Sequence, residues 1–355
     1  MVRNAQPGVA KAAQWAEDIV ASLAGHRVAP TAENACAVVA VIGQESSFRE
    51  NPAVPGLGKK AAAEISALLD GTGIPGVGGV LQAYLEDNPA PKNSFMDQIR
   101  AAKTEKDLDM TYRKLINNII GNPELSKLVT SIDFIKNAIE EKNKIKTIGA
   151  MQVSVRFAVA YEEKRQHKTL TIEDIYRIRD QLYTRKGGIF YGVSQLLGYD
   201  TGYGRKLFRF ADYNAGRYSS RNAALQKVIA TLAGAKLQTD GDLLLYDAEG
   251  RAQPAESSTE QAIQAVSMRL SLGWSAAAIR DDLSHEKENA FKETRTYKVL
   301  RQLYQKRNGE PAYAIVPDIT LHSPKIRRRM TTADFAHAVD KRYQACMRTV
   351  GQEGR

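Results

Sequence analysis

The sequence predicts a mainly α-helical protein. Three observations support this prediction: apolar residues recur every three or four positions over long stretches, helix-capping residues lie at the ends of these stretches, and one short segment resembles a β-hairpin. The chain has 355 residues. A chain of this length can bury a substantial core, either as one large domain or as a core with a smaller unit.

The first part of the chain predicts two helices followed by a turn-rich segment. An amphipathic stretch runs from Val9 to Leu23, and Thr31 is a plausible N-cap for the next helix, which carries Val38 to Glu45. Residues 51–58 contain two prolines and two glycines in close succession and are not expected to be helical. This turn-rich segment is expected to line one side of a cleft beyond Glu45.

The rest of the chain also favours helices. The interval 59–147 contains three amphipathic stretches, and residues 241–250 resemble a small hairpin with turn chemistry at 248–250. Further helices are predicted by the spacing of apolar residues and by caps, including Gly216 as a C-cap and Thr331 or Thr332 as an N-cap. The expected helical ranges are 62–69, 94–120, 132–145, a helix from the 149–152 segment through Tyr161, 172–185, 259–307 with breaks near Gly273 and Ser284, and 332–348.

Composition restricts the classes of function. The formal net charge of +10 fits an acidic or polyanionic neighbourhood, such as cell wall, anionic lipid or nucleic acid. Nucleic acid ranks last because the basic residues form no recognised nucleic-acid module, and the densest cluster, 325–329, is typical of a solvated surface. No apolar run is long enough to span a membrane. The five histidines show no ligand spacing, so we expect no metal site and no cofactor.

The chain has two cysteines, Cys36 and Cys346. Two cysteines are too few for a disulfide scaffold or a structural zinc site. In an oxidising compartment they could pair, whereas a buried free thiol at Cys36 is equally compatible with its apolar surroundings.

Glu45 is the first candidate for chemistry. It follows Val38, Val41 and Ile42 at helical spacing, so it continues an apolar face. A carboxylate against apolar neighbours is costly to ionise, and its pKa is expected to rise toward that of a general acid. A partly exposed glutamate at a helix end is the alternative interpretation.

Four short motifs occur in a fixed order along the chain. They are Glu45-Ser-Ser-Phe48, Gly149-Ala-Met-Gln152, Ala211-Asp-Tyr-Asn-Ala-Gly216 and Glu293-Thr-Arg-Thr-Tyr297. Their order and content resemble the lysozyme-like lytic transglycosylases of the soluble-lytic-transglycosylase type. Each motif alone is a weak signal, but four in order are strong.

The resemblance implies a chemistry that needs one carboxylate. Glu45 would protonate the leaving oxygen of the MurNAc–GlcNAc β-1,4 bond of peptidoglycan, and the substrate's acetamido group would stabilise the sugar. Ionised Glu45 would then deprotonate the muramic acid 6-hydroxyl, which closes a 1,6-anhydro ring. The resemblance also implies substrate-binding roles for six further residues, namely Ser46, Met151, Gln152, Tyr213, Asn214 and Tyr297.

The chain departs from the family pattern at two motif positions. Ala150 replaces a leucine, which would widen the pocket. Asp212 replaces an alanine; if it faced the cleft it could act as a second carboxylate, but we expect it to face solvent.

The resemblance further implies a lysozyme-like core interrupted by insertions. Residues 1–58 would form the first part of the core and residues 59–147 an inserted helical subdomain. Residues 148–309 would complete the core, with a hairpin insertion near 236–257, and residues 310–355 would form a C-terminal extension and helix. The whole chain, including the Arg217–Ala224 segment, also resembles an uncharacterised family of proteobacterial lipoproteins.

The lipoprotein resemblance implies a periplasmic protein tethered to the outer membrane by a lipid anchor that is absent from this chain. The expected partners are therefore peptidoglycan glycan strands. Three alternatives stay open: a non-catalytic peptidoglycan-binding or scaffold protein, a hydrolytic muramidase that uses Asp212, and an exported effector with the same chemistry.

Overall fold

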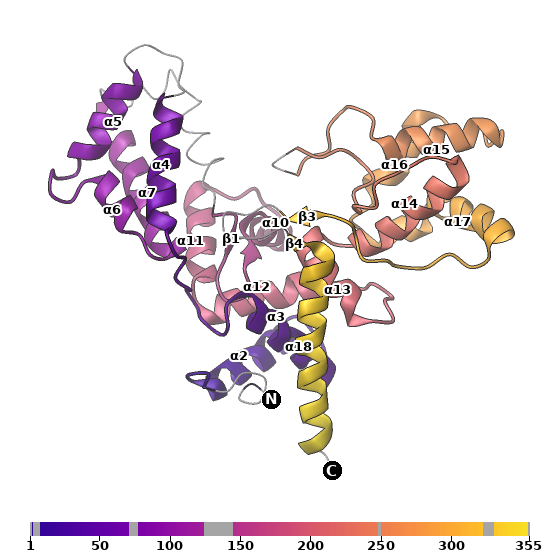
Figure 1. Ribbon diagram of the computed structural model, residues 1–355, viewed down its shortest axis with the longest axis horizontal. Coiled ribbons are helices and arrows are strands. Elements are labelled where there is room, and N and C mark those ends of the chain that lie inside the picture. Colours follow the sequence, from indigo (N-terminus) through magenta and orange to yellow (C-terminus); the bar gives the residue numbers. More distant parts are fainter. Residues whose placement is uncertain are drawn as a thin grey trace. The chain divides into compact units, whose positions relative to one another are not determined.

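The computed structural model confirms a mainly helical fold with small β elements (Figure 1). It describes residues 2, 8–70, 77–123, 145–247, 250–321 and 330–353. These residues divide into two compact units. The first unit comprises Met1–Gln44 and Gly192–Arg355, and the second unit comprises Glu45–Tyr191.

The second unit consists of short helices and one two-stranded sheet. Strand β1 pairs antiparallel with β2, with Thr147 opposite Ser154 and Ile148 opposite Val153. Helix α4 packs against α5 and α6, and α6 packs against α7. The elements are α4 Leu57–Asp70, α5 Val77–Asp87, α6 Phe95–Ala101, α7 Glu105–Ile120, β1 Thr147–Ile148, β2 Val153–Ser154, α10 Val155–Gln166 and α11 Ile172–Leu182, with α12 Arg185–Leu197 crossing into the first unit.

The first unit contains the remaining elements. Helix α13 packs against the long C-terminal helix α18, and α14 packs against α15 and α17. Strands β3 and β4 pair antiparallel. The elements are α2 Ala12–Gly25, α3 Ala32–Glu45, α13 Lys206–Ala215, α14 Ser219–Ala233, α15 Ser258–Arg269, α16 Ala276–Ser284, the 3₁₀ helix η1 Asn289–Glu293, α17 Arg295–Asn308, β3 Thr320–Leu321, β4 Met330–Thr331 and α18 Thr332–Glu353.

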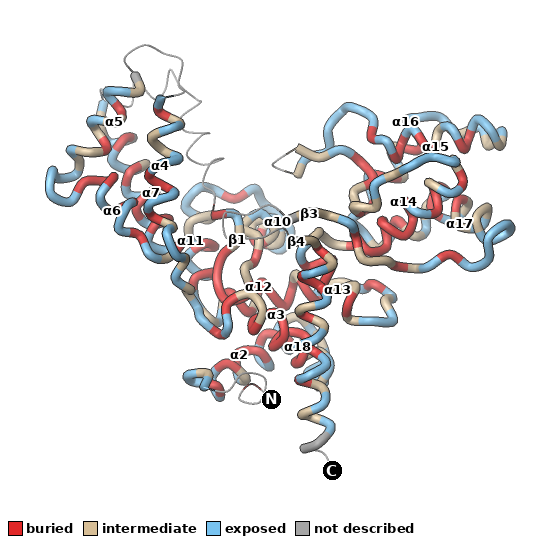
Figure 2. The backbone as a smooth tube through the Cα atoms, viewed as in Figure 1, coloured by how far each residue is buried: buried red, intermediate tan, exposed pale blue. Residues whose placement is uncertain are grey.

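Helix α3 is a core helix rather than an amphipathic surface helix. Every residue from Ala35 to Gly43 is buried, and Figure 2 shows the helix in the colour of buried residues. A helix that is apolar on all sides is stable only when other elements surround it. Its start agrees with the sequence, because Thr31 Oγ1 accepts a hydrogen bond from the Asn34 amide at 3.3 Å.

Most of the expected helices are present, with differences in 59–147. The expected helix 94–120 is two helices, because the Thr104–Asp107 capping box starts α7 anew after the end of α6. Helix α5 was not expected, and the expected helix 132–145 lies almost wholly outside the described residues. The small hairpin is confirmed at its base, where Tyr246 and Ala252 form an antiparallel bridge. The four-part division of the core and its insertions stays a prediction.

The two cysteines form a disulfide bond that joins α3 to α18. The bond links residues separated by 310 positions. A cross-link across so long a loop strongly restricts the unfolded chain. It also fits an oxidising compartment, because disulfides rarely persist in a reducing cytosol.

We expect loss of this disulfide to destabilise the first unit. Replacing Cys36 or Cys346 by serine should lower the free energy of unfolding by about 2–5 kcal/mol. Urea unfolding followed by circular dichroism, with and without a thiol reductant, measures the effect. Each serine variant should match the reduced wild-type protein, and an unchanged midpoint on reduction would contradict the prediction.

Candidate functional site

The first motif lies where α3 ends. Glu45 is the last residue of α3 and is half-buried, while Ser46 is buried. Ser47 and Phe48 follow with φ of 51° and 60°. Two consecutive non-glycine residues in the left-handed region are costly, by about 1–3 kcal/mol each, and such strain clusters at functional sites. The chain therefore turns sharply just after the candidate catalytic carboxylate.

Ser46 helps to close this turn. Its Oγ accepts a hydrogen bond from the Arg49 amide at 3.3 Å. The hydroxyl therefore bonds to the backbone of its own turn, and the substrate-binding role that the family resemblance implies for Ser46 stays a prediction.

The second motif forms the tight turn between β1 and β2. Gly149 has a φ of 81°, and a Cβ on this residue would lie 2.1 Å from the Leu182 carbonyl oxygen, so only glycine fits. Ala150 and Met151 are fully buried. The helix expected to begin at this motif begins three residues after Gln152, at Val155 in α10.

The side-chain amide of Gln152 is held by hydrogen bonds at both its nitrogen and its oxygen. It has a φ of 52°. Its Nε2 donates to the Gly149 carbonyl at 3.1 Å and to Oε2 of Glu105 at 3.5 Å, and its Oε1 accepts from Thr147 Oγ1 at 3.0 Å. Because an amide nitrogen has two donors, both are used within the protein.

Glu105 is a buried carboxylate that the sequence did not single out. It is the first residue of α7 and is only 4 % exposed. The segment that follows the first motif packs directly beside it: Asn51 Nδ2 donates to Thr104 Oγ1 at 3.0 Å, and Val54 N donates to the Lys103 carbonyl at 2.9 Å. Hydrogen bonds thus link residues 51–54 to the start of α7, where Glu105 lies, and a further hydrogen bond links Glu105 to Gln152 of the second motif.

A buried charged network continues along α7 beyond Glu105. Asp109 is fully buried and accepts hydrogen bonds from Arg113 and from Arg179 Nε, the latter at 2.8 Å. Tyr183 is 4 % exposed, and its hydroxyl has no hydrogen-bond partner within the described ranges. Burial raises the pKa of Tyr183, and the charges of Asp109 and Glu105 raise this pKa further.

The third motif lies on α13 in the first unit. Tyr213 is buried, and its carbonyl oxygen accepts from Gln195 Nε2 at 3.0 Å. Asn214 is exposed, and its Oδ1 accepts from Thr332 Oγ1, at the start of α18, at 3.2 Å. Gly216 ends α13 with a φ of 113°, as the sequence predicted.

The expectation that Asp212 faces solvent is wrong. Asp212 is 2 % exposed and accepts hydrogen bonds from the Tyr199 and Tyr203 hydroxyls at 3.2 and 2.8 Å. Its oxygens also accept from the backbone amides of Tyr218 and Ser220, at 2.9 and 2.7 Å, where α14 begins. Burial raises the pKa of Asp212 to about 6. These four bonds describe a structural carboxylate that fixes the α13–α14 connection.

The fourth motif lies at the start of α17, where Thr294 is the N-cap. Tyr297 is 5 % exposed and belongs to the core formed by α14 to α17. Its ring packs edge-to-face on Phe291 with a centroid distance of 5.4 Å. Within the part of the chain that the structure describes, its hydroxyl has no hydrogen-bond partner. This environment is that of a core tyrosine, and a substrate-binding role for Tyr297 stays a prediction.

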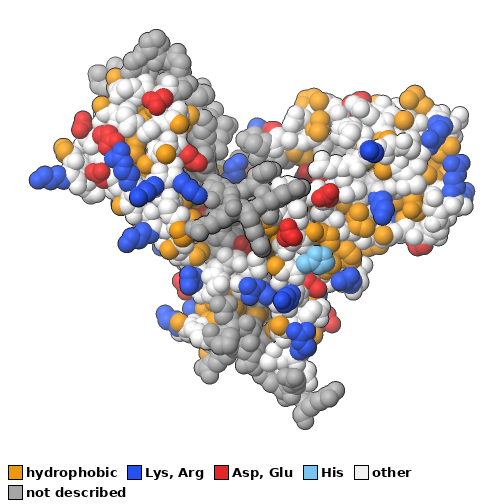
Figure 3. All heavy atoms as spheres, in the orientation of Figure 1, with side chains coloured by type: hydrophobic (Ala, Val, Ile, Leu, Met, Phe, Trp, Pro, Cys, Tyr) orange, Lys and Arg blue, Asp and Glu red, His pale blue; other side chains and the backbone are white. Residues whose placement is uncertain are grey.

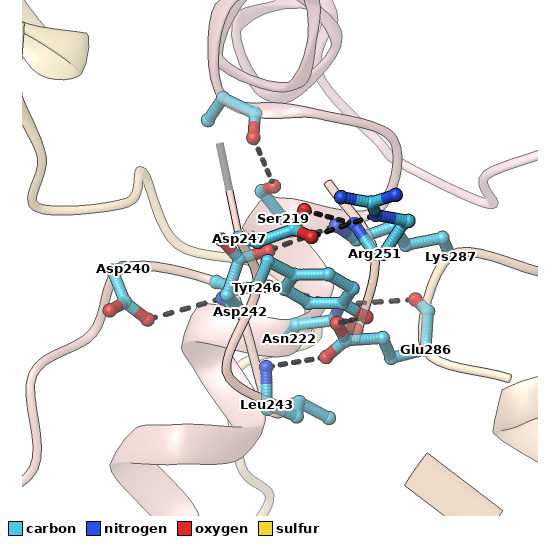
Figure 4. A network of polar contacts seen from close by, with 12 residues as sticks. Ser219, Asn222, Asp240, Asp242, Leu243, Tyr246, Asp247, Arg251, Glu286 and Lys287 are labelled. Carbon is cyan, nitrogen blue, oxygen red and sulfur yellow. Dashed lines mark hydrogen bonds and ion pairs between the residues drawn. The ribbon is translucent and has the colours of Figure 1, made fainter. Parts of the chain in front are cut away.

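The segment after the third motif forms a second buried polar network in the first unit (Figure 4). Arg221 is fully buried and donates to the carbonyl oxygens of Glu286 and Glu288 at 2.6 and 2.9 Å. Glu286 accepts from the Leu243 amide and from the Tyr246 hydroxyl. Burial raises the pKa of the Glu286 carboxyl to about 8. This network therefore fastens the loop after α14 to the segment before η1.

Neither the distribution of charged side chains on the face drawn in Figure 3 nor the metal-binding side chains of the described residues indicate a further site. On the face drawn in Figure 3, lysine and arginine side chains are scattered among acidic ones over the coloured residues. The described ranges contain no group of three histidine, cysteine, aspartate or glutamate side chains that could hold a metal ion. No helix among these residues is long and apolar enough to cross a membrane.

The seven residues predicted for the site thus fall into two groups. Glu45, Ser46, Met151 and Gln152 lie in the second unit, and Tyr213, Asn214 and Tyr297 lie in the first unit. The structure adds Glu105 and Tyr183, which lie in the second unit together with Glu45, Ser46, Met151 and Gln152. The capping-box pattern of Thr104 and Asp107 would have predicted from the sequence that Glu105 begins a helix. No pattern in the sequence predicts that Glu105 is buried.

These features define a disulfide-linked helical protein with strained turns at two of its motifs. The chain belongs to the family described as "Protein of unknown function (DUF1615)", whose model matches residues 8–349. It is similar to the "Uncharacterized protein YaiW" of Escherichia coli (strain K12), with 35% identity over 350 residues. The alignment covers 98% of this chain and 89% of that protein. No solved structure matches the chain.

The Glu286 network gives a prediction for the pH dependence of stability. A carboxyl whose pKa is about 8 in the folded protein holds its proton longer than in the unfolded chain. Its stabilising effect is complete below the unfolded pKa and is lost as the pH rises through the folded pKa. As the pH rises from 6 to 8, the free energy of unfolding should fall by at most about 1.4 kcal/mol per pH unit, and the slope should decrease near pH 8 because Glu286 itself ionises there.

The matched variant is Glu286→Gln, which keeps the shape and an acceptor oxygen but cannot titrate. Chemical unfolding at pH 6, 7 and 8 measures both proteins. The wild type should lose stability across this range relative to the variant, and parallel pH profiles would refute the prediction.

Proposed function

We propose that this protein is a peptidoglycan lytic transglycosylase that cleaves the MurNAc–GlcNAc β-1,4 bond and forms a 1,6-anhydroMurNAc end. Glu45 is the general acid and then the general base. The protein acts on glycan strands in the periplasm, tethered to the outer membrane, and needs no cofactor. The order of the four motifs is the basis of the proposal.

The observation that carries the proposal is the conformation of the first motif. A half-buried glutamate lies at the end of a helix whose residues 35–43 are all buried, and after Ser46 come two residues in the left-handed region. The backbone just after this carboxylate is strained, and strained backbone is more typical of a functional site than of an ordinary helix end. The strained Gln152 of the second motif, in the same unit, adds to this support.

The proposed reaction assigns two proton transfers to Glu45. The carboxyl gives its proton to the leaving oxygen, and the acetamido carbonyl of the substrate bonds to the anomeric carbon. The 6-hydroxyl oxygen then displaces the acetamido oxygen, and its proton returns to Glu45. No water is consumed. Asp212 offers little to a hydrolytic alternative, because its oxygens are occupied by four structural hydrogen bonds.

The proposal predicts that Glu45→Gln abolishes release of soluble muropeptides from purified sacculi and leaves the fold intact. Glu33→Gln, an exposed glutamate in the first turn of the same helix, is the matched control and should retain full activity. Mass spectrometry of the products identifies the reaction. A reducing-end product is about 18 Da heavier than an anhydro product, because hydrolysis consumes water.

Each other outcome excludes the proposal in a distinct way. Unchanged release by Glu45→Gln would exclude Glu45 as the acid. Heavier products from the wild type would identify a hydrolytic muramidase. Binding of intact sacculi without any soluble product would identify a non-catalytic binding protein.

A further inference from the structure

We infer that Glu105 is a second functional carboxylate, which accepts a hydrogen bond from the acetamido N–H of the substrate and stabilises the positive charge that develops during cleavage. This inference rests on the proposed function. The family motifs have no second catalytic carboxylate at a matching position. Glu105 lies between the first and second motifs in the sequence.

The position of Glu105 is the first support. A glutamate at the first position of a helix is normally solvated, because the helix dipole favours an acid there without any burial. Glu173, in the first turn of α11, shows this ordinary case and is exposed. Glu105 is instead 4 % exposed. Burying a carboxylate costs free energy that contacts within the protein must offset. The hydrogen bond from Gln152 is one such contact, and it ties the buried carboxylate to the second motif.

The contact with the second motif is the second support. Gln152 Nε2 donates to Glu105 Oε2 at 3.5 Å. The same nitrogen also donates to the Gly149 carbonyl, and Gln152 Oε1 accepts from the Thr147 hydroxyl. Gln152 therefore orients the carboxylate. A carboxylate can accept about four hydrogen bonds. Bonding to Gln152 is thus compatible with bonding to a ligand as well.

The hydroxyl of Tyr183 is the third support. It is buried, and within the described residues it lacks a hydrogen-bond partner. Burial raises the pKa of Tyr183, the charge of Asp109 raises it further, and the charge of Glu105 adds a smaller contribution. A buried hydroxyl without a partner marks a place where a water molecule or a ligand completes the bonding. Here the charge of Glu105 acts on that hydroxyl.

The chemistry gives Glu105 a defined role. When the glycosidic bond breaks, the acetamido carbonyl oxygen bonds to the anomeric carbon and the acetamido nitrogen gains positive charge. A carboxylate that accepts a hydrogen bond from this N–H stabilises the charged intermediate more than the neutral substrate. Glu105 itself forms no covalent bond and keeps no proton, so the balance of the proposed reaction is unchanged.

Two variants separate the charge of Glu105 from its hydrogen bonding. Glu105→Gln keeps an acceptor oxygen but removes the charge, so kcat on sacculi should fall by about 10²–10³-fold with little change in KM. Glu105→Ala also removes the acceptor. In the Glu45→Gln background, it should weaken binding of tetra-N-acetylchitotetraose about tenfold by calorimetry. Glu173→Gln is the control for a helix-terminal glutamate and should match the wild type in both assays.

The outcomes distinguish this inference from the proposed function. If the wild type cleaves sacculi and Glu105→Gln cleaves equally fast, the inference is wrong and the proposed function stands. If the wild type binds the tetrasaccharide without cleaving sacculi, the proposed function is wrong, and weaker binding by Glu105→Ala then supports the acetamido contact while equal binding overturns it. If the wild type neither cleaves nor binds, both are wrong. Thermal unfolding of Glu105→Gln close to that of the wild type excludes misfolding as the cause of a low kcat.

Discussion

The candidate site of the second unit depends on the pairing of residues 51–54 with residues 103–104. This short contact consists of a backbone bond from Val54 to Lys103, a bridge between Ala53 and Thr104, and the side-chain bond from Asn51. It fixes the chain just after the strained turn of the first motif against the start of α7. Since α7 begins with Glu105, and Glu105 contacts Gln152, a few hydrogen bonds join segments that are about a hundred residues apart in sequence.

Three of the buried carboxylates among the described residues have different surroundings, and the surroundings indicate different roles. Asp212 accepts hydrogen bonds from two backbone amides and two tyrosine hydroxyls. Four hydrogen bonds satisfy both oxygens, which is typical of a carboxylate that stabilises the fold. Glu286 accepts hydrogen bonds from the Leu243 amide and the Tyr246 hydroxyl, and so holds the loop after α14 in place. Glu105 contacts a strained motif residue by a long hydrogen bond and has an unpartnered phenol nearby. A buried carboxylate beside a strained motif residue is a candidate for a functional role.

Local signals predicted much of the fold, whereas burial of polar groups could not be predicted. The caps at Thr31 and Gly216 follow from backbone chemistry within a few residues, so the sequence located them correctly. Helix α5 was missed because the glycines near its start, Gly78 and Gly79, weaken the helical pattern. The burial of Asp212 depends on hydroxyls of tyrosines on the preceding helix connection, and that of Glu105 depends on tertiary packing. Neither arrangement leaves a periodic signal in the sequence.

A second carboxylate does not by itself convert a transglycosylase into a hydrolase. A hydrolytic base must face a water molecule at the anomeric carbon, whereas a carboxylate bonded to an acetamido N–H holds the substrate's own nucleophile in place. The two roles need different geometry from the same side chain. Gln152 orients Glu105 from a turn in which Gly149 admits no side chain, so the carboxylate has little freedom to change between them. The rigidity of this turn therefore favours one role for Glu105, and the acetamido role is the one that agrees with a single proton-transferring residue at Glu45.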